Sequence, residues 1–107
     1  MLIKPYDVAK ELHNDLQESF NGFNVVPMVD FVNHAGKIIS ESEYDIEKAI
    51  EDNAVNIANK LYDELDKSLN LPTFVDIIAK DLFIPIACNL IKAFIEHKQF
   101  FEDKKDV

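Results

Sequence analysis

The sequence predicts an all-α protein, a compact bundle of four to six helices formed by one domain at residues 1–107. Only two glycines and four prolines interrupt the chain. Leu, Ala, Glu, Lys and Asp are mixed with the β-branched residues, a balance that suits helices better than a set of short strands. Several segments repeat an apolar residue every three or four positions, which is typical of helices that place one face on a core.

The first helix is expected to begin at Pro5, since proline suits the first helical position, and to end at Asn21–Gly22. Within it, every fourth residue is apolar, at Val8, Leu12, Leu16 and Phe20. This spacing places an apolar stripe along one side of the helix.

The next segment is expected to form a turn at Phe23–Pro27 and then a short second helix, which starts near Met28 and is stopped by Gly36. Residues Lys37–Ile39 are compatible with an extended conformation. The chain offers no convincing second strand to pair with them, so a sheet is not expected.

A long acidic amphipathic helix is expected to follow, from near Ser42 to near Leu69, with Ser40 or Ser42 as its N-cap. Its apolar arc consists of Ile46, Ile50, Ala54, Ile57, Leu61 and Leu65. Steps of three and four residues place these side chains on one face. The middle of the segment holds four poor helix formers, Asp52, Asn53, Asn56 and Asn59. They indicate where this helix would kink or break.

The last third of the chain is expected to form the remaining helices. A sharp junction at Leu71–Pro72–Thr73 precedes a helix through Phe74 to Leu82. Pro85 either kinks one long helix or begins a new one, because proline removes a backbone hydrogen bond. Apolar residues surround most of the segment Ile86–Ile95, which predicts an apolar C-terminal helix. The side chains expected to be buried are Ile46, Ile50, Ile57, Leu61, Leu65, Ile78, Leu82, Leu90, Ile91 and Phe94.

Charge and composition exclude several classes of ligand. The net charge is −9 and the chain contains no arginine, so direct binding to nucleic acid or to anionic lipid is not expected. The most apolar run, Leu82–Ile95, has 14 residues and includes Lys92, whereas about 20 apolar residues are needed to span a bilayer. A single cysteine, Cys88, and the absence of a cleavable leader favour a cytoplasmic location.

Catalytic and cofactor motifs are missing from the sequence. Two isolated glycines cannot build a phosphate-binding loop, and no glutamate precedes a histidine by three residues, as di-iron bundles require. The three histidines, His13, His34 and His97, lie on different predicted segments, and Cys88 in its apolar context is expected to be a packing residue. We therefore expect no enzyme activity, no cofactor and no metal site.

The distribution of negative charge is the strongest functional signal. Nine acidic residues and three lysines lie between Glu41 and Lys67, so this segment carries six of the nine net negative charges. A solvated face that keeps the protein soluble is the simpler interpretation. The alternative is a docking surface for a basic protein partner. On a helical projection the acidic side chains of one group fall together, with two asparagines nearby. The candidate partner-binding residues are these acidic residues, Glu41, Asp45, Asp52, Asp63 and Asp66, and the asparagines Asn56 and Asn59.

Two functions are compatible with these features. The first is a small acidic binding protein that occupies a basic site on a nuclease or nucleic-acid-binding protein, as an immunity protein, an antitoxin or a phage-encoded inhibitor would. The second is a structural or assembly subunit that forms a homodimer through Phe100, Phe101 and the apolar C-terminal helix, since two adjacent phenylalanines cannot both face one core.

Overall fold

The structure, a computed structural model, describes residues 4–69 and 74–105, with side chains for all of these except residues 21, 75 and 98–105. This part of the chain contains no strand, which confirms the all-α prediction. Four long helices and one single-turn helix follow one another: α1 (Pro5–Ser19), α2 (Met28–Glu41), α3 (Ile50–Ser68), α4 (Phe74–Ile77) and α5 (Lys80–Lys105). A short 3₁₀ helix, η1 (Asn21–Val25), occupies the predicted turn between α1 and α2.

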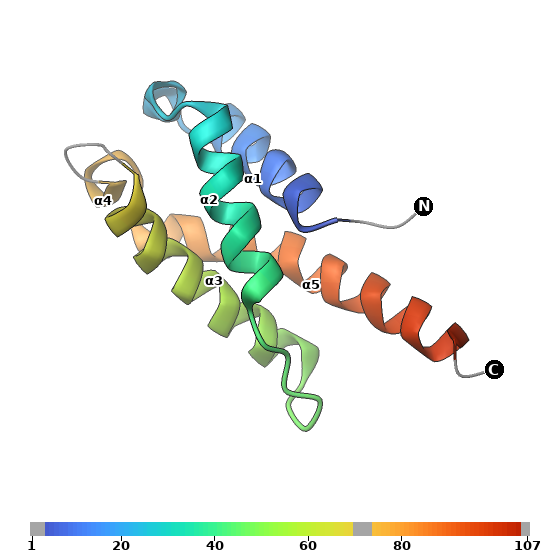
Figure 1. Cartoon of the computed structure of the whole chain (residues 1–107). Coiled ribbons are helices and arrows are strands. Elements are labelled where there is room, and N and C mark those ends of the chain that lie inside the picture. The colour runs from blue at the N-terminus through green and yellow to red at the C-terminus, as the bar shows by residue number, and fades with distance from the viewer. Residues whose placement is uncertain (1–3, 70–73, 106–107) are drawn as a thin grey trace.

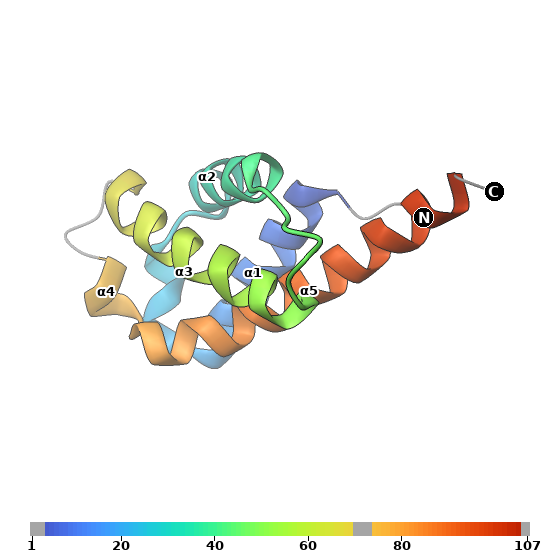
Figure 2. The same cartoon turned by 90° about the horizontal axis from the view of Figure 1, so that it is seen from below.

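The helices form two packed pairs (Figure 1). One pair is α1 with α2, joined by η1, and the other is α3 with α5, joined through α4. Contacts of α1 with α5 and of α2 with α3 hold the two pairs together. The last turns of α5 extend past all the other helices (Figures 1 and 2). The connection between α2 and α3, residues 42–49, is named the α2–α3 loop below.

The prediction that Gly36 stops the second helix is wrong. Gly36 is buried inside α2, and residues Lys37–Ile39, which sequence left open to an extended conformation, belong to the same helix. The ring of Tyr6 in α1 lies against Gly36, where any Cβ atom would overlap it. This glycine therefore allows α1 and α2 to approach closely. The two residues in contact are 30 positions apart in the sequence, so the need for glycine comes from tertiary packing.

The long acidic helix begins later than predicted. Ser42 follows the end of α2, where its hydroxyl donates to the carbonyl of Ile38, and α3 begins only at Ile50. Ile46, expected in the apolar arc, is 82% exposed in the α2–α3 loop. From Ile50 onward the prediction holds: α3 is continuous to Ser68, without a break at its asparagines, and it buries the arc residues Ala54, Ile57, Leu61 and Leu65.

The helix expected from Phe74 to Leu82 is interrupted. Its first part, α4, ends at Ile77, and α5 starts a new helical phase at Lys80. In that phase a buried stripe recurs every four residues, at Phe83, Ala87, Ile91 and Ile95. Leu82 lies off this stripe and is 52% exposed, so its predicted burial is wrong. Pro85 is inside α5, which continues through it as one helix. The predicted junction at Leu71–Pro72–Thr73 lies outside the described residues.

The core combines aliphatic stripes with aromatic side chains. Five of the residues predicted to be buried are buried, namely Ile57, Leu61, Leu65, Ile78 and Ile91. Three more, Ile50, Leu90 and Phe94, are partly buried and pack against the core. Four aromatic side chains from η1, α3, α4 and α5 form a continuous cluster, in which neighbouring ring centres are 5.2–6.3 Å apart: Phe23, Tyr62, Phe74 and Phe83.

Candidate partner-binding surface

The seven predicted site residues do not share one helix. Glu41 is the last residue of α2, and Asp45 lies in the α2–α3 loop. The single helix face predicted for the five acidic residues is therefore wrong for these two. The other five, spaced by four, three, four and three residues, do follow one face of α3: Asp52, Asn56, Asn59, Asp63 and Asp66.

Two carboxylates near the C-terminal end of α3 contact residues of α4 and α5. The backbone N–H of Phe74 donates to Asp66 Oδ1 at 2.9 Å, and Lys80 Nζ lies 3.3 Å from Asp63 Oδ1. The same ammonium lies 5.8 Å from the ring centre of Tyr62, whose hydroxyl donates to the carbonyl of Ile78 at 2.9 Å. Burial, followed by the nearby Asp66 carboxylate, raises the pKa of Tyr62. These contacts join α3 to α4 and α5.

The asparagines of the predicted face have different surroundings. Asn59 is half-buried, and its Nδ2 donates to the carbonyl of Val55 one turn earlier, at 2.9 Å. Asn56 is exposed. It lines a shallow, open hollow where the end of α2 meets α3, together with Glu41, Ser42, Glu43, Ile57 and Lys60. The structure thus brings Glu41 and Asn56 to one surface although they belong to different helices.

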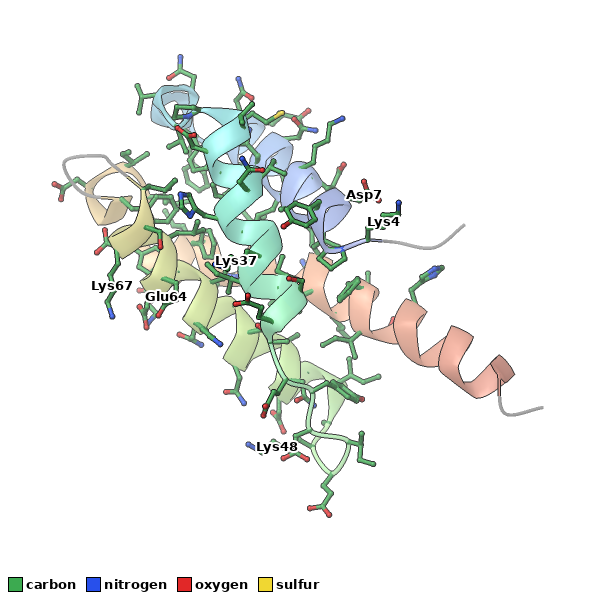
Figure 3. All side chains as sticks on the ribbon, viewed as in Figure 1. Lys4, Asp7, Lys37, Lys48, Glu64 and Lys67 are labelled. Carbon is green, nitrogen blue, oxygen red and sulfur yellow. The ribbon has the colours of Figure 1, made fainter. Side chains whose placement is uncertain are left out.

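The excess negative charge gathers at the α2–α3 loop. Six exposed acidic residues, named the loop carboxylates, belong to the loop or border it: Glu41, Glu43, Asp45, Glu47, Glu51 and Asp52. Within residues 41–52 only Lys48 opposes them, and Figure 3 shows it at the loop end of the molecule, whereas Lys67 lies at the α4 end of α3. In the part of the chain that the structure describes, none of the six forms an ion pair.

One buried amide orders the α2–α3 loop. Asn53, in the first turns of α3, is 3% exposed. Its Oδ1 accepts the backbone N–H of Asp45 at 2.9 Å, and its Nδ2 donates to the carbonyl of Asp45 at 2.9 Å. The same Nδ2 lies 3.1 Å from the carbonyl of Ala49 and 3.4 Å from that of Lys48. The Asp45 carboxylate accepts the N–H of Glu47 at 3.0 Å, which closes a turn inside the loop.

Sequence reasoning missed both Asn53 and the exposed Ile46 as features of this surface. A signal for Asn53 was present: it lies three residues after Ile50 and next to Ala54, hence on the core side of α3. A polar residue at a core position is expected to have hydrogen-bond partners. No comparable signal exists for Ile46, since its spacing of four from Ile50 fits an apolar helical stripe.

The histidines and the cysteine do not form a second site among the described residues. His13 is 3% exposed, packs against Phe23 and Phe31, and donates from Nε2 to the carbonyl of Val26 at 2.8 Å, which ties α1 to the end of η1. Burial, followed by the Glu51 carboxylate, raises the pKa of the half-buried Cys88 thiol, while Lys92 opposes this rise. The side chains that the structure describes include no cluster of three His, Cys, Asp or Glu suited to a metal ion.

The described helices also contain no stretch long and apolar enough to cross a membrane. Comparisons of the chain with protein-family models, with curated proteins and with solved structures gave no match.

Proposed function

We propose that this chain is a small protein-binding module that occupies a basic site on a partner protein, in the manner of an inhibitor, immunity protein or antitoxin. One observation carries the proposal: six exposed loop carboxylates surround one loop and have no ion-pair partners in the described chain. Carboxylates that serve the fold, such as Asp63 and Asp66, contact other helices instead. The loop carboxylates form no ion pair in the described chain, and Asp45 Oδ1 accepts the Glu47 N–H within the loop itself, which leaves the acidic surface available to a partner.

The partner implied by this surface is a protein with clustered lysine or arginine side chains. Complementary charges accelerate encounter and set orientation more than they increase affinity. A site that ordinarily binds the phosphates of a nucleic acid has the required positive charge, which supports a nuclease or a nucleic-acid-binding protein as the partner class.

Neutralising loop carboxylates is expected to slow association with such a partner. The triple variant Glu41→Gln, Glu43→Gln, Glu47→Gln removes three exposed charges that form no ion pair in the described chain, and it should keep the fold. We expect the association rate to fall about tenfold at low salt and its salt dependence to flatten, because screening acts over about 8 Å at physiological ionic strength. Surface plasmon resonance at several salt concentrations, with a partner captured from the native host, measures both quantities.

A matched control distinguishes the effect of charge at the α2–α3 loop from the effect of the net charge of the protein. Glu11→Gln, Glu18→Gln, Glu96→Gln removes the same charge from exposed positions on α1 and α5. If both triple variants slow association equally, net charge alone attracts the partner and the α2–α3 loop is not its docking surface. Circular dichroism checks that both variants remain helical.

Self-association through α5 is the second candidate function, and the projection of its last turns past the other helices favours it (Figure 2). The side chains of Phe100 and Phe101 lie outside the described residues. Sedimentation equilibrium at micromolar concentration tests this alternative. A dimer that Phe101→Ala converts to monomer would support it, whereas a wild-type monomer whose mass and stability are unchanged by the substitution would dismiss it.

A further inference from the structure

We propose that Ile46 is the apolar anchor of the interface, and that it inserts into an apolar pocket edged by lysine or arginine side chains on the partner. This inference rests on the proposed function and adds an apolar recognition element, which lies between Asp45 and Glu47 in the sequence. The observation behind it is a juxtaposition: the most exposed of the large apolar side chains described sits on a loop that a buried amide holds in place.

The exposure of Ile46 has no explanation in the fold. At 82% exposure it contributes almost nothing to the core, and loops ordinarily carry Gly, Asn, Asp or Ser at such positions. Single exposed apolar residues are common on protein surfaces. Among the large apolar side chains described as exposed, Ile46 is the one that lies on a loop between helices, and the backbone of this loop at Asp45 and Lys48 is fixed by hydrogen bonds to Asn53.

A fixed loop makes Ile46 suitable as an anchor. Ordering a mobile loop on binding reduces affinity, and a loop already ordered in the free protein avoids this cost. Binding hot spots also combine a desolvated centre with a polar rim that excludes water. Here the apolar centre is Ile46, and the rim consists of the loop carboxylates next to it in sequence, including Asp45 and Glu47.

The charge of the rim identifies the occupant. A second copy of this chain carries the same net charge of −9 and would place its own carboxylates against the loop. A basic protein surface instead pairs cations with the rim while its apolar pocket receives Ile46. Another exposed apolar residue, Val29, is 70% exposed at the start of α2, the end of that helix away from the loop (Figure 1). Of its two sequence neighbours, Met28 and Asp30, one is acidic, whereas both neighbours of Ile46 are, and Val29 therefore serves as a control.

The test uses the intact chain and two synthetic peptides of equal positive charge. One is oligolysine, and in the other leucines separate the lysines. Binding is followed by amide chemical shifts of the ¹⁵N-labelled protein, which give the dissociation constant and the location. We expect both peptides to shift the α2–α3 loop, with the leucine-containing peptide about tenfold tighter, the scale set by burying a large aliphatic side chain. Ile46→Ser should abolish this advantage, and Val29→Ser should leave it unchanged.

The possible outcomes separate the two proposals. If both peptides bind the loop with equal affinity, or if Ile46→Ser leaves the tenfold advantage intact, Ile46 is not an anchor while the acidic docking surface stands. If neither peptide shifts the loop amides, the docking surface itself is overturned, and the anchor with it. Because Ile46 is 82% exposed, Ile46→Ser should leave the protein folded.

Discussion

Replacing Phe74 with alanine is expected to lower the free energy of unfolding by about 3 to 5 kcal/mol. Phe74 is 1% exposed and is the central ring of the aromatic cluster. Its ring centre lies 5.5 Å from that of Tyr62, 5.8 Å from that of Phe83 and 6.3 Å from that of Phe23. Truncation removes these contacts and leaves a cavity at the junction of η1, α3, α4 and α5, which a four-residue helix cannot fill by moving as a rigid unit.

Chemical denaturation followed by circular dichroism measures this loss. Val29→Ala, which truncates a side chain that is 70% exposed, is the control and should change stability by less than about 0.5 kcal/mol. A loss below about 1 kcal/mol for Phe74→Ala would mean that α4 contributes little to the core and that α3 and α5 pair without it.

The sequence was sufficient to predict those elements whose apolar spacing coincides with their burial. In α1, the stripe Val8, Leu12, Leu16 is buried as expected, and proline opens the helix at Pro5. In α3, the arc from Ala54 to Leu65 is buried as well. Local periodicity succeeds in these cases because each helix presents one continuous face to its neighbours.

The errors occurred where a tertiary contact decides local structure. Gly36 resembles a helix stop but serves the approach of Tyr6. Ile46 continues the spacing of the α3 stripe, yet it lies in a loop whose backbone at Asp45 is hydrogen-bonded to Asn53. Leu82 continues the four-residue spacing of Phe74 and Ile78, but the helix is interrupted between Ile77 and Lys80, and the new helix buries a different set of positions. None of these contacts can be derived from a residue's immediate neighbours.

The acidic character of the site was predictable, but its division into two groups was not. Sequence places Asp52 and Asp66 on one face of one helix. Only the fold shows that Asp63 meets Lys80, 17 residues away, and that Asp66 binds the backbone of Phe74. Among the predicted site residues, this leaves Glu41, Asp45 and Asp52 as the carboxylates that form no bond to another helix in the described chain. The partner-binding role of these residues stays a prediction.

Asn53→Ala is expected to lower the free energy of unfolding by about 2 to 3 kcal/mol and to weaken partner binding as well. The substitution removes the acceptor for Asp45 N–H and the donors to the carbonyls of Asp45, Lys48 and Ala49. Each hydrogen bond contributes about 1 kcal/mol. At the exposed loop, water can replace part of the lost hydrogen bonding. The higher helix propensity of alanine offsets roughly 0.5 kcal/mol of the loss in stability. Denaturation with urea measures the stability change.

The matched control is Asn56→Ala, which makes the same substitution one turn later in α3, at an asparagine that is exposed. It should change stability by less than about 0.5 kcal/mol. Asn53→Ala should also speed amide exchange at residues 45–49, since these groups lose their protection. It should weaken binding of the leucine-containing peptide more than binding of oligolysine, because an unfixed Ile46 must be ordered on binding. Unchanged exchange in the loop, or equal weakening of both peptides, would show that Asn53 stabilises α3 without positioning Ile46.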